Sequence, residues 1–142
     1  MNEPRNAPTV MITGAAGSLG TAVAAAFAAF GAKLALVDLQ QAQLQRAYPQ
    51  PNERQLLLPA NLLEQAQVQD AVARATQQFA RIDVLCNIAG GFRMGPAVHE
   101  TSDEDWQFLF DINVRTMLNA VRAVVPKMIG QGGGSIINVG AN

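Results

Sequence analysis

The sequence predicts an α/β protein built on a doubly wound parallel sheet. Apolar, strand-like runs alternate along the chain with helix-like runs, in the order βαβαβαβαβ. The strand-like runs lack the inside/outside alternation of a sheet that faces water, which is typical of parallel strands covered by helices on both faces. Right-handed crossovers between such strands favour a doubly wound sheet, with a ligand crevice at the carboxyl ends of the strands.

Each element is expected from its local pattern, with polar, glycine or proline residues between the runs. Five strands are expected, at residues 9–14, 33–38, 55–61, 82–90 and 135–140. Helices are expected at residues 18–30, 41–47, 63–79 and 103–129. Thr101 or Ser102 can cap the last helix, because Glu104 or Asp105 follows at the spacing of a capping box. Pro126 is expected to bend or end that helix.

Composition bounds the class of protein. The 142 residues are 49% hydrophobic and 15% charged, which predicts one compact domain over residues 1–142. A formal net charge of −1 gives no basic face for nucleic acid or anionic lipid, and so favours small-molecule ligands. Residues 1–8 lack the apolar stretch of a signal peptide, and the apolar run 22–30 is too short for the roughly 20 residues of a membrane span. The single cysteine, Cys86, cannot form an internal disulfide, so we expect a cytoplasmic protein.

The glycine-rich turn TGAAGSLG, residues 13–20, joins the first strand to the first helix. Unpaired N–H groups and the helix dipole make such a junction a site for pyrophosphate. Gly14 permits the sharp turn, Gly17 lets the backbone approach a phosphate, and Gly20 allows close packing of helix on strand. A glycine-rich turn can also join two elements without binding anything. Here strand, turn, helix and second strand follow in the order of a Rossmann dinucleotide site, which favours the functional interpretation.

Asp38 ends the second strand, close to the roughly 20-residue spacing at which an acidic residue accepts hydrogen bonds from an adenosine ribose. A carboxylate in that place repels a 2′-phosphate. No arginine or lysine lies within residues 39–45 to neutralise such a phosphate, so we expect NAD, with NADP the less favoured cofactor. The alternative is a solvated aspartate at the end of a strand.

Five motifs together resemble the short-chain dehydrogenase/reductase family over nearly the whole chain: TGAAGSLG, VDL, PAN with the following leucine, NIAG and DINV. The resemblance implies cofactor contacts by Gly14, Gly17, Ser18, Leu19, Gly20, Asp38, Leu39, Asn61, Leu62, Asn87, Ala89 and Gly90. In the family the glycine turn meets the pyrophosphate, Asp38 matches the ribose acid, and Asn61 with Leu62 matches the adenine contacts. Serine stands at 18 where glycine is usual, and Asn61 stands where aspartate is common.

NIAG departs from the family pattern Asn-Asn-Ala-Gly, because Ile88 replaces the second asparagine. Asn87 is still expected to tie neighbouring strands through its side chain, while Ala89 and Gly90 leave room for the cofactor's ribose. Asn113 matches the helix asparagine that supports a water in the family's proton relay, and is the one catalytic residue that the resemblance implies here. Without the motif, a mid-helix asparagine is expected simply to bond a neighbouring carbonyl.

Other departures concern catalysis. The family places a serine after the fifth strand, where this chain has Gly140 and Ala141. Its tyrosine and lysine lie four residues apart, whereas the one tyrosine here, Tyr48, is followed by Pro49 and has no such lysine. Family members run to about 250 residues. The resemblance therefore implies the first part of such a protein, with five strands present, the C-terminal part of the sheet missing, and no activity from these residues alone.

The function implied is an oxidoreductase that transfers a hydride between NAD(H) and an alcohol or carbonyl substrate. The alternative is a non-catalytic module that binds a dinucleotide or a partner, and a third interpretation is a site for another adenosyl ligand, as in a methyltransferase. Family members commonly pack the long helix, here residues 103–129, against its copy, so we expect a homo-oligomer, either a dimer or a tetramer. An apolar stripe at helical spacing supports this, namely Trp106, Phe110, Val114, Leu118 and Val121.

The remaining single residues are weaker signals. His99 has no second histidine or cysteine nearby, so we expect a surface histidine and no metal site. Cys86 lies within an apolar run and is expected to be a buried hydrophobe. For Trp106, Phe108 and Phe110, core or partner packing is favoured over stacking on a substrate.

Overall fold

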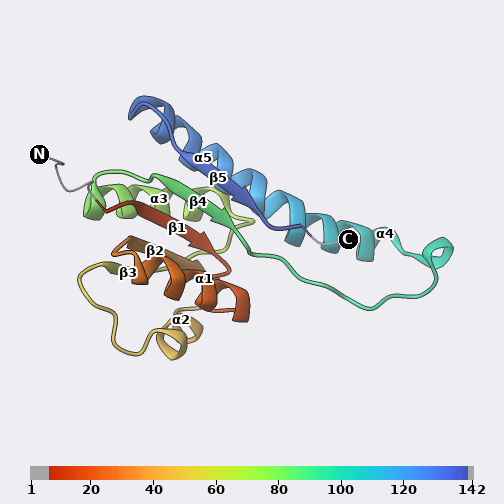
Figure 1. Cartoon of the computed structure of the whole chain (residues 1–142). Coiled ribbons are helices and arrows are strands. Elements are labelled where there is room, and N and C mark those ends of the chain that lie inside the picture. Colours follow the sequence, from red (N-terminus) through yellow and green to blue (C-terminus); the bar gives the residue numbers. More distant parts are fainter. Residues whose placement is uncertain (1–6, 141–142) are drawn as a thin grey trace, which may run out of the picture.

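The computed structural model describes residues 7–140, and its centre is a five-stranded parallel sheet (Figure 1). The strands are β1 (Thr9–Thr13), β2 (Lys33–Asp38), β3 (Gln55–Pro59), β4 (Val84–Asn87) and β5 (Ser135–Asn138). Their spatial order is β3-β2-β1-β4-β5, and all four pairings are parallel. The chain therefore builds outward from β1 in one direction and then returns to add β4 on the other side. This reversal confirms the predicted doubly wound sheet and opens a crevice beside β1.

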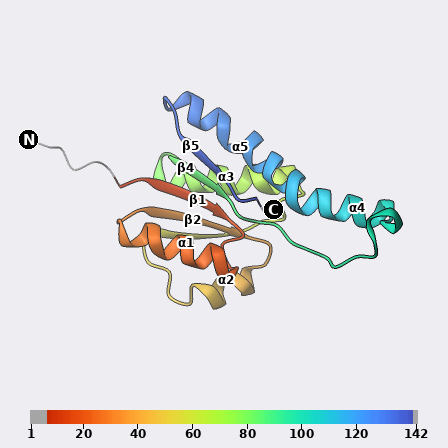
Figure 2. The same ribbon diagram turned by 45° about the vertical axis from the view of Figure 1, so that its right-hand side comes forward.

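Helices cover both faces of the sheet (Figure 2). The helices are α1 (Ser18–Ala29), α2 (Gln41–Ala47), α3 (Gln65–Phe79), α4 (Asp103–Phe110) and α5 (Thr116–Gly130), with a short 3-10 turn η1 (Val98–Glu100). Val10 and Ile12 pack with α1 and α2 residues on one face, whereas Met11 packs with α3 and α5 residues on the other. Both sides of β1 and most of β2 are thus buried, whereas every residue of the edge strand β5 is exposed. The double burial explains why the runs of these inner strands showed no alternation.

The strands end earlier than the sequence pattern predicted. The first ends at Thr13 because Gly14 turns into the left-handed region, with a φ of +66°. The predicted strand 82–90 is a strand only from Val84 to Asn87, and those at 55–61 and 135–140 end at Pro59 and Asn138. The helix expected from 63 begins at Gln65. The residues predicted as strand beyond Pro59 and beyond Asn87, namely Ala60, Asn61, Ile88, Ala89 and Gly90, line a cavity at the edge of the sheet instead.

The long helix expected over residues 103–129 is helical throughout but divided. A π-helical turn, η2 (Asp111–Arg115), separates α4 from α5. Ser102 caps α4, since its Oγ accepts a hydrogen bond from Asp105 N at 3.1 Å, so Ser102 is confirmed as the cap of the two residues predicted. Pro126 does not end the helix, because α5 continues past it to Gly130, and the alternative expectation of a bend stays a prediction. Val124 and Met128 on either side of the proline are buried, and their packing offsets the lost backbone hydrogen bond.

Candidate functional site

A cavity of about 560 Å³ lies at the carboxyl ends of the strands. Its walls come from the glycine turn after β1, the residues after β2, β3 and β4, and the α4–α5 helix. Of the residues predicted for the site, it is lined by Gly14, Gly17, Ser18, Leu19, Gly20, Asp38, Leu39, Asn61, Leu62, Ala89 and Gly90. Asn87 and Asn113 do not line it. The fold thus brings together residues that are spread over four loops.

Two glycines of the turn have no room for a side chain. A Cβ on Gly20 would lie 2.1 Å from the carbonyl oxygen of Gly14, and a Cβ on Gly14 would lie 2.8 Å from the nitrogen of Ala89. These contacts show that α1 packs closely on the turn that follows β1, as Gly20 predicted, and that this turn also packs on the NIAG segment. At Gly17 a Cβ would make only an ordinary contact of 3.4 Å. The expected approach of its backbone to a phosphate therefore stays a prediction.

The turn presents unpaired N–H groups to the cavity. The preceding donors are used internally: Ala15 N bonds Val37 O at 3.0 Å, and Ala16 N bonds the Oδ2 atom of Asp38 at 2.9 Å. Helical bonding starts only at Thr21, whose N–H donates to Gly17 O at 2.9 Å. In the described part of the chain, no acceptor pairs with the N–H groups of Ser18, Leu19 and Gly20. Three free donors at the positive end of a helix form an anion site.

Asp38 is held rigidly beside this anion site. Its Oδ2 atom accepts the Ala16 N–H at 2.9 Å and its Oδ1 atom accepts the Leu39 N–H at 2.8 Å. The carboxylate is half-buried and lines the cavity. Each carboxylate oxygen can accept a second hydrogen bond, so the group keeps acceptor capacity for hydroxyl donors. Its geometry suits a polyol and opposes an anion at the same place.

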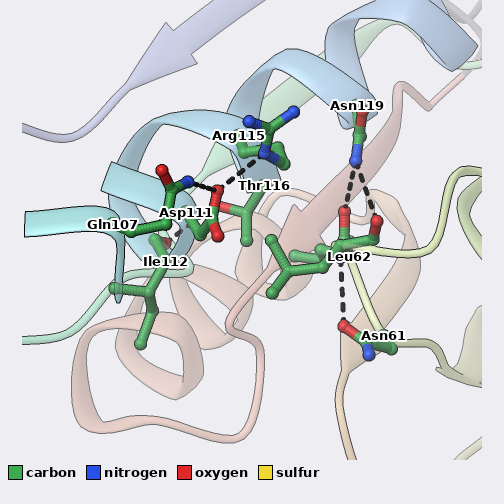
Figure 3. A network of polar contacts seen from close by, with 9 residues as sticks. Asn61, Leu62, Gln107, Asp111, Ile112, Arg115, Thr116 and Asn119 are labelled. Carbon is green, nitrogen blue, oxygen red and sulfur yellow. Dashed lines mark hydrogen bonds and ion pairs between the residues drawn. The ribbon is translucent and has the colours of Figure 1, made fainter. Parts of the chain in front are cut away.

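The wall after β3 is tied to helix α5 (Figure 3). The Nδ2 atom of buried Asn119 donates to Leu62 O at 2.9 Å and to Leu63 O at 3.4 Å. The Oδ1 atom of Asn61 accepts the Leu63 N–H at 3.0 Å, which leaves one lone pair for the adenine amino group that the resemblance assigned to it. Asn119 was missed from the sequence because its partners lie 57 and 56 residues away.

The NIAG segment is fixed by neighbouring side chains. The Oγ1 atom of Thr13 accepts the N–H groups of Ile88 and Ala89, both at 3.2 Å. Asn87 donates through Nδ2 to the Oδ1 atom of Asn138 at 2.9 Å, which confirms that it ties β4 to β5. Asn87 therefore lies within the sheet, where it supports the site without lining the cavity. Its own buried Oδ1 atom has no partner among the described residues.

Asn113 lies on the π-helical turn and joins the helix to the loop after β4. Its Nδ2 atom donates to Gly91 O and to Leu109 O, both at 2.9 Å, and its Oδ1 atom accepts the Gly91 N–H at 3.0 Å. The same oxygen would be 2.7 Å from a Cβ on Gly90, so a side chain there would displace the Asn113 amide. The bond to Leu109 O is the kind expected without the motif. The catalytic role that the resemblance implies for Asn113 stays a prediction.

Further cavity residues were not singled out as site residues in the sequence, namely Ala60, Leu63, Ile88, Phe108, Asp111, Ile112 and Thr116. Asp111 carries the charge among them, and Figure 3 shows its carboxylate between Gln107 and Arg115. Its Oδ1 atom accepts Arg115 Nε at 2.7 Å and Gln107 Nε2 at 2.9 Å. The hydrogen bond from Arg115, followed by that from Gln107, lowers the pKa of Asp111. The DINV motif contained this residue but gave no sign that it faces a cavity.

The last predictions from the sequence concern Cys86, His99 and the aromatic residues of α4. Cys86 is buried as expected, and burial raises the pKa of its thiol. His99 is exposed on η1, and within residues 7–140 no three His, Cys, Asp or Glu side chains gather to hold a metal ion. Of the two kinds of packing expected for the aromatic residues, core packing is not found, since α4 has no buried residue and Trp106 is 67% exposed, and packing on a partner stays a prediction. Phe108 instead lines the cavity, with the Arg93 guanidinium 3.9 Å from its ring centre.

No helix in the described part of the chain has the length and apolar character needed to cross a bilayer.

The family model described as short chain dehydrogenase matches residues 8–142. The chain is 35% identical over 134 residues to 2,3-dihydro-2,3-dihydroxybenzoate dehydrogenase of Bacillus subtilis, covering 92% of this chain and 51% of that protein. It is 34% identical over 132 residues to D-threitol dehydrogenase of Mycolicibacterium smegmatis, covering 91% and 50%.

A solved structure with a similar fold is 3-ketoacyl-(acyl-carrier-protein) reductase from Brucella melitensis complexed with NADH, with a TM-score of 0.84 and 27% identity. The match covers 94% of this chain and 57% of that one. The chain spans about half the length of the curated relatives it matches.

Proposed function

This chain belongs to the short-chain dehydrogenase/reductase family, and from that premise we propose that it is the cofactor-binding part of an NAD(H)-dependent oxidoreductase acting on an alcohol or carbonyl. The observation that carries the proposal is one cavity with free helix N–H donors on one wall and the Asp38 carboxylate beside them. The donors suit a pyrophosphate and the carboxylate suits the ribose hydroxyls. When bound, the nicotinamide supplies hydride transfer.

The residues of this chain bind and orient the cofactor in that proposal. Ser18, Leu19 and Gly20 hold the pyrophosphate through their N–H groups, and Asp38 with Leu39 holds the adenosine ribose. Asn61 and Leu62, fixed by Asn119, form the adenine wall. Ala89 and Gly90 leave space along the other ribose, while Asn87 and Asn113 keep the NIAG segment in place. Asp38 favours NAD over NADP because it repels a 2′-phosphate.

The alternative is a non-catalytic module that binds a dinucleotide, and one observation favours it for these 142 residues. Tyr48 is the single tyrosine, and its hydroxyl is engaged with Ala15 O at 2.7 Å on the outer side of the glycine turn. Burial, and then the charge of Asp38, raises its pKa to about 12, which is unsuited to proton transfer near neutral pH. Family membership argues against the third interpretation, a methyltransferase-like site.

Assembly and cellular setting belong to the proposal as well. Trp106, Phe110, Val114 and Leu118 are at least 38% exposed and offer an apolar helix face for a second copy. We propose a homo-oligomer, either a dimer or a tetramer, joined through α4 and α5. A cytoplasmic setting suits a chain with a single buried thiol. Small molecules are its proposed substrates, with no role for nucleic acid or membrane.

Replacing Ser18 by aspartate tests the anion site without harming the fold. Ser18 is the exposed first residue of α1, where a carboxylate stabilises a helix by roughly 0.3–1 kcal/mol. The same carboxylate repels a pyrophosphate, so we expect Ser18→Asp to weaken NADH binding at least about tenfold. A fluorescence titration with NADH measures the loss, and a thermal melt checks the fold. The control is Ser18→Asn, because asparagine has the size of aspartate but no charge. This variant should bind NADH nearly as tightly as the unmodified chain does.

Two outcomes contradict the proposal. One is an unmodified chain that binds no NADH at millimolar concentration. The other is a Ser18→Asp chain that binds NADH as tightly as the unmodified one, because the pyrophosphate then lies elsewhere.

A further inference from the structure

Tyr48 reaches the glycine turn from outside the cofactor cavity. It follows α2 directly, and its ring packs against the buried cluster that β1, β2, α1 and α2 share. Its hydroxyl donates to the carbonyl oxygen of Ala15 at 2.7 Å, across 33 residues of sequence. Tyr48 is not among the residues that line the cavity. The hydroxyl therefore contacts the turn and not the space for the ligand.

The bond falls on a peptide group that is held at both ends. The Ala15 carbonyl and the Ala16 N–H belong to one planar peptide unit. Tyr48 holds the oxygen of this unit, and Asp38 Oδ2 holds its nitrogen at 2.9 Å. Among the described residues, no other donor reaches the Ala15 carbonyl. Removing the phenol hydroxyl frees one end of the unit and leaves a carbonyl without its partner.

This peptide unit sets the direction of the donors that follow it. Gly17 is next in the chain, and the free N–H groups begin at Ser18. A rotation of the Ala15–Ala16 peptide would carry the Ala16 N–H away from Asp38 and change the path into α1. Asp38 keeps a second support, because its Oδ1 atom still accepts the Leu39 N–H at 2.8 Å, so the larger effect falls on the donors that face the pyrophosphate. The tyrosine ring alone does not hold the peptide unit, because a phenylalanine fills the same space without a donor.

We propose that Tyr48 is a positioning residue of the cofactor site: its hydroxyl orients the glycine turn, so that the helix N–H groups meet the pyrophosphate. This inference rests on the proposed function, because it assigns a pyrophosphate to those N–H groups. The phenol suits the task, since its raised pKa of about 12 keeps it protonated, and a donor, at any working pH. The sequence indicated only that Tyr48 is not the catalytic tyrosine, and this proposal gives it a role in cofactor binding.

Tyr48→Phe tests the proposal with two probes. ADP carries the pyrophosphate that the turn meets, whereas adenosine carries only the ribose and the base. We expect the Kd for ADP to rise about three- to tenfold, the range for one neutral hydrogen bond, and that for adenosine to change less than about twofold. Ligand-observed NMR measures both affinities on the 142-residue chain. Partial unfolding lowers both affinities by the same factor, so the ratio of the two Kd values is the decisive quantity.

Arg54→Met is the matched control. Arg54 Nη1 donates to Gly31 O at 2.7 Å, which is also a bond of that length from a side chain to a backbone carbonyl, but it lies at the amino ends of β2 and β3, away from the cavity. In this variant the ratio of the Kd for ADP to the Kd for adenosine should stay at the value of the unmodified chain. An unchanged ratio in Tyr48→Phe, or an equal change in Arg54→Met, overturns the inference alone. If the unmodified chain binds neither ADP nor NADH, the proposed function fails, and the inference fails with it.

Discussion

NADH is expected to bind this chain roughly 10- to 100-fold more tightly than NADPH, because a 2′-phosphate would be brought against the Asp38 carboxylate. The carboxylate has little freedom to move aside. Two backbone N–H groups, from Ala16 and Leu39, hold its oxygens at 2.9 and 2.8 Å. A rigid, half-buried charge repels a phosphate dianion more strongly than a mobile surface charge does.

Asp38→Asn should bring the two affinities to within about threefold of each other, since it removes the charge but keeps the size and one acceptor oxygen. Asp38→Ala is the informative contrast. It releases both the Ala16 and the Leu39 N–H, whereas asparagine can still accept one of them, so with alanine both cofactors should bind more weakly while the gap between them closes. Parallel calorimetric titrations with NADH and NADPH at low and moderate salt measure the ratio. Tighter binding of NADPH by the unmodified chain would contradict the assignment of Asp38.

Arg46 is the cation that works against this selectivity. It comes one residue after the segment 39–45 on which the sequence argument rested, and it lines a second cavity together with Asp38 and Gln43. Arg46 is exposed and makes no ion pair with Asp38 in the described part of the chain. An exposed charge of this kind contributes on the order of 1 kcal/mol or less. The adjacent, fixed carboxylate is therefore expected to dominate.

The sequence predicted those parts of the structure that depend on local patterns. The apolar runs predicted the strands, and the glycine turn predicted the first wall of the cavity. Ser102 predicted the start of α4. The spacing of Asp38 after the turn brought it to the cavity, because the carboxyl ends of β1 and β2 are neighbours in the sheet.

The rest depends on contacts between distant segments. Tyr48 meets Ala15 across 33 residues, and Asn119 meets Leu62 across 57, so neither partner is visible in a window of the sequence. The π-helical turn at Asp111–Arg115 carries no residue that breaks a helix, and it was not predicted. Pro126 failed as a stop signal because the buried neighbours Val124 and Met128 outweigh its local effect.

The last strand predicts that these 142 residues associate with one another. Within residues 7–140 β5 pairs with β4 alone, and every residue of β5 is exposed, including Ile136 and Ile137 at 38% and 47%. An apolar, β-branched edge with free N–H and C=O groups recruits other strands. The α4–α5 stripe adds a second surface, although its member Val121 packs partly against the core. Static light scattering at micromolar concentration is therefore expected to give a mass well above the 15.1 kDa of one chain.

Two charged substitutions separate the two surfaces. Ile137→Lys places a charge on the edge strand and should remove open-ended, concentration-dependent growth, because edge lysines oppose strand addition. Val114→Glu places a charge on the exposed helix stripe and should instead remove a closed dimer, since a two-fold contact buries the same position from both copies. The double variant should be monomeric. A stable monomer of 15.1 kDa from the unmodified chain would mean that neither surface drives association. If open-ended association persists in Val114→Glu and is lost in Ile137→Lys, it is assigned to the β5 edge. The closed dimer is then assigned to the helix stripe.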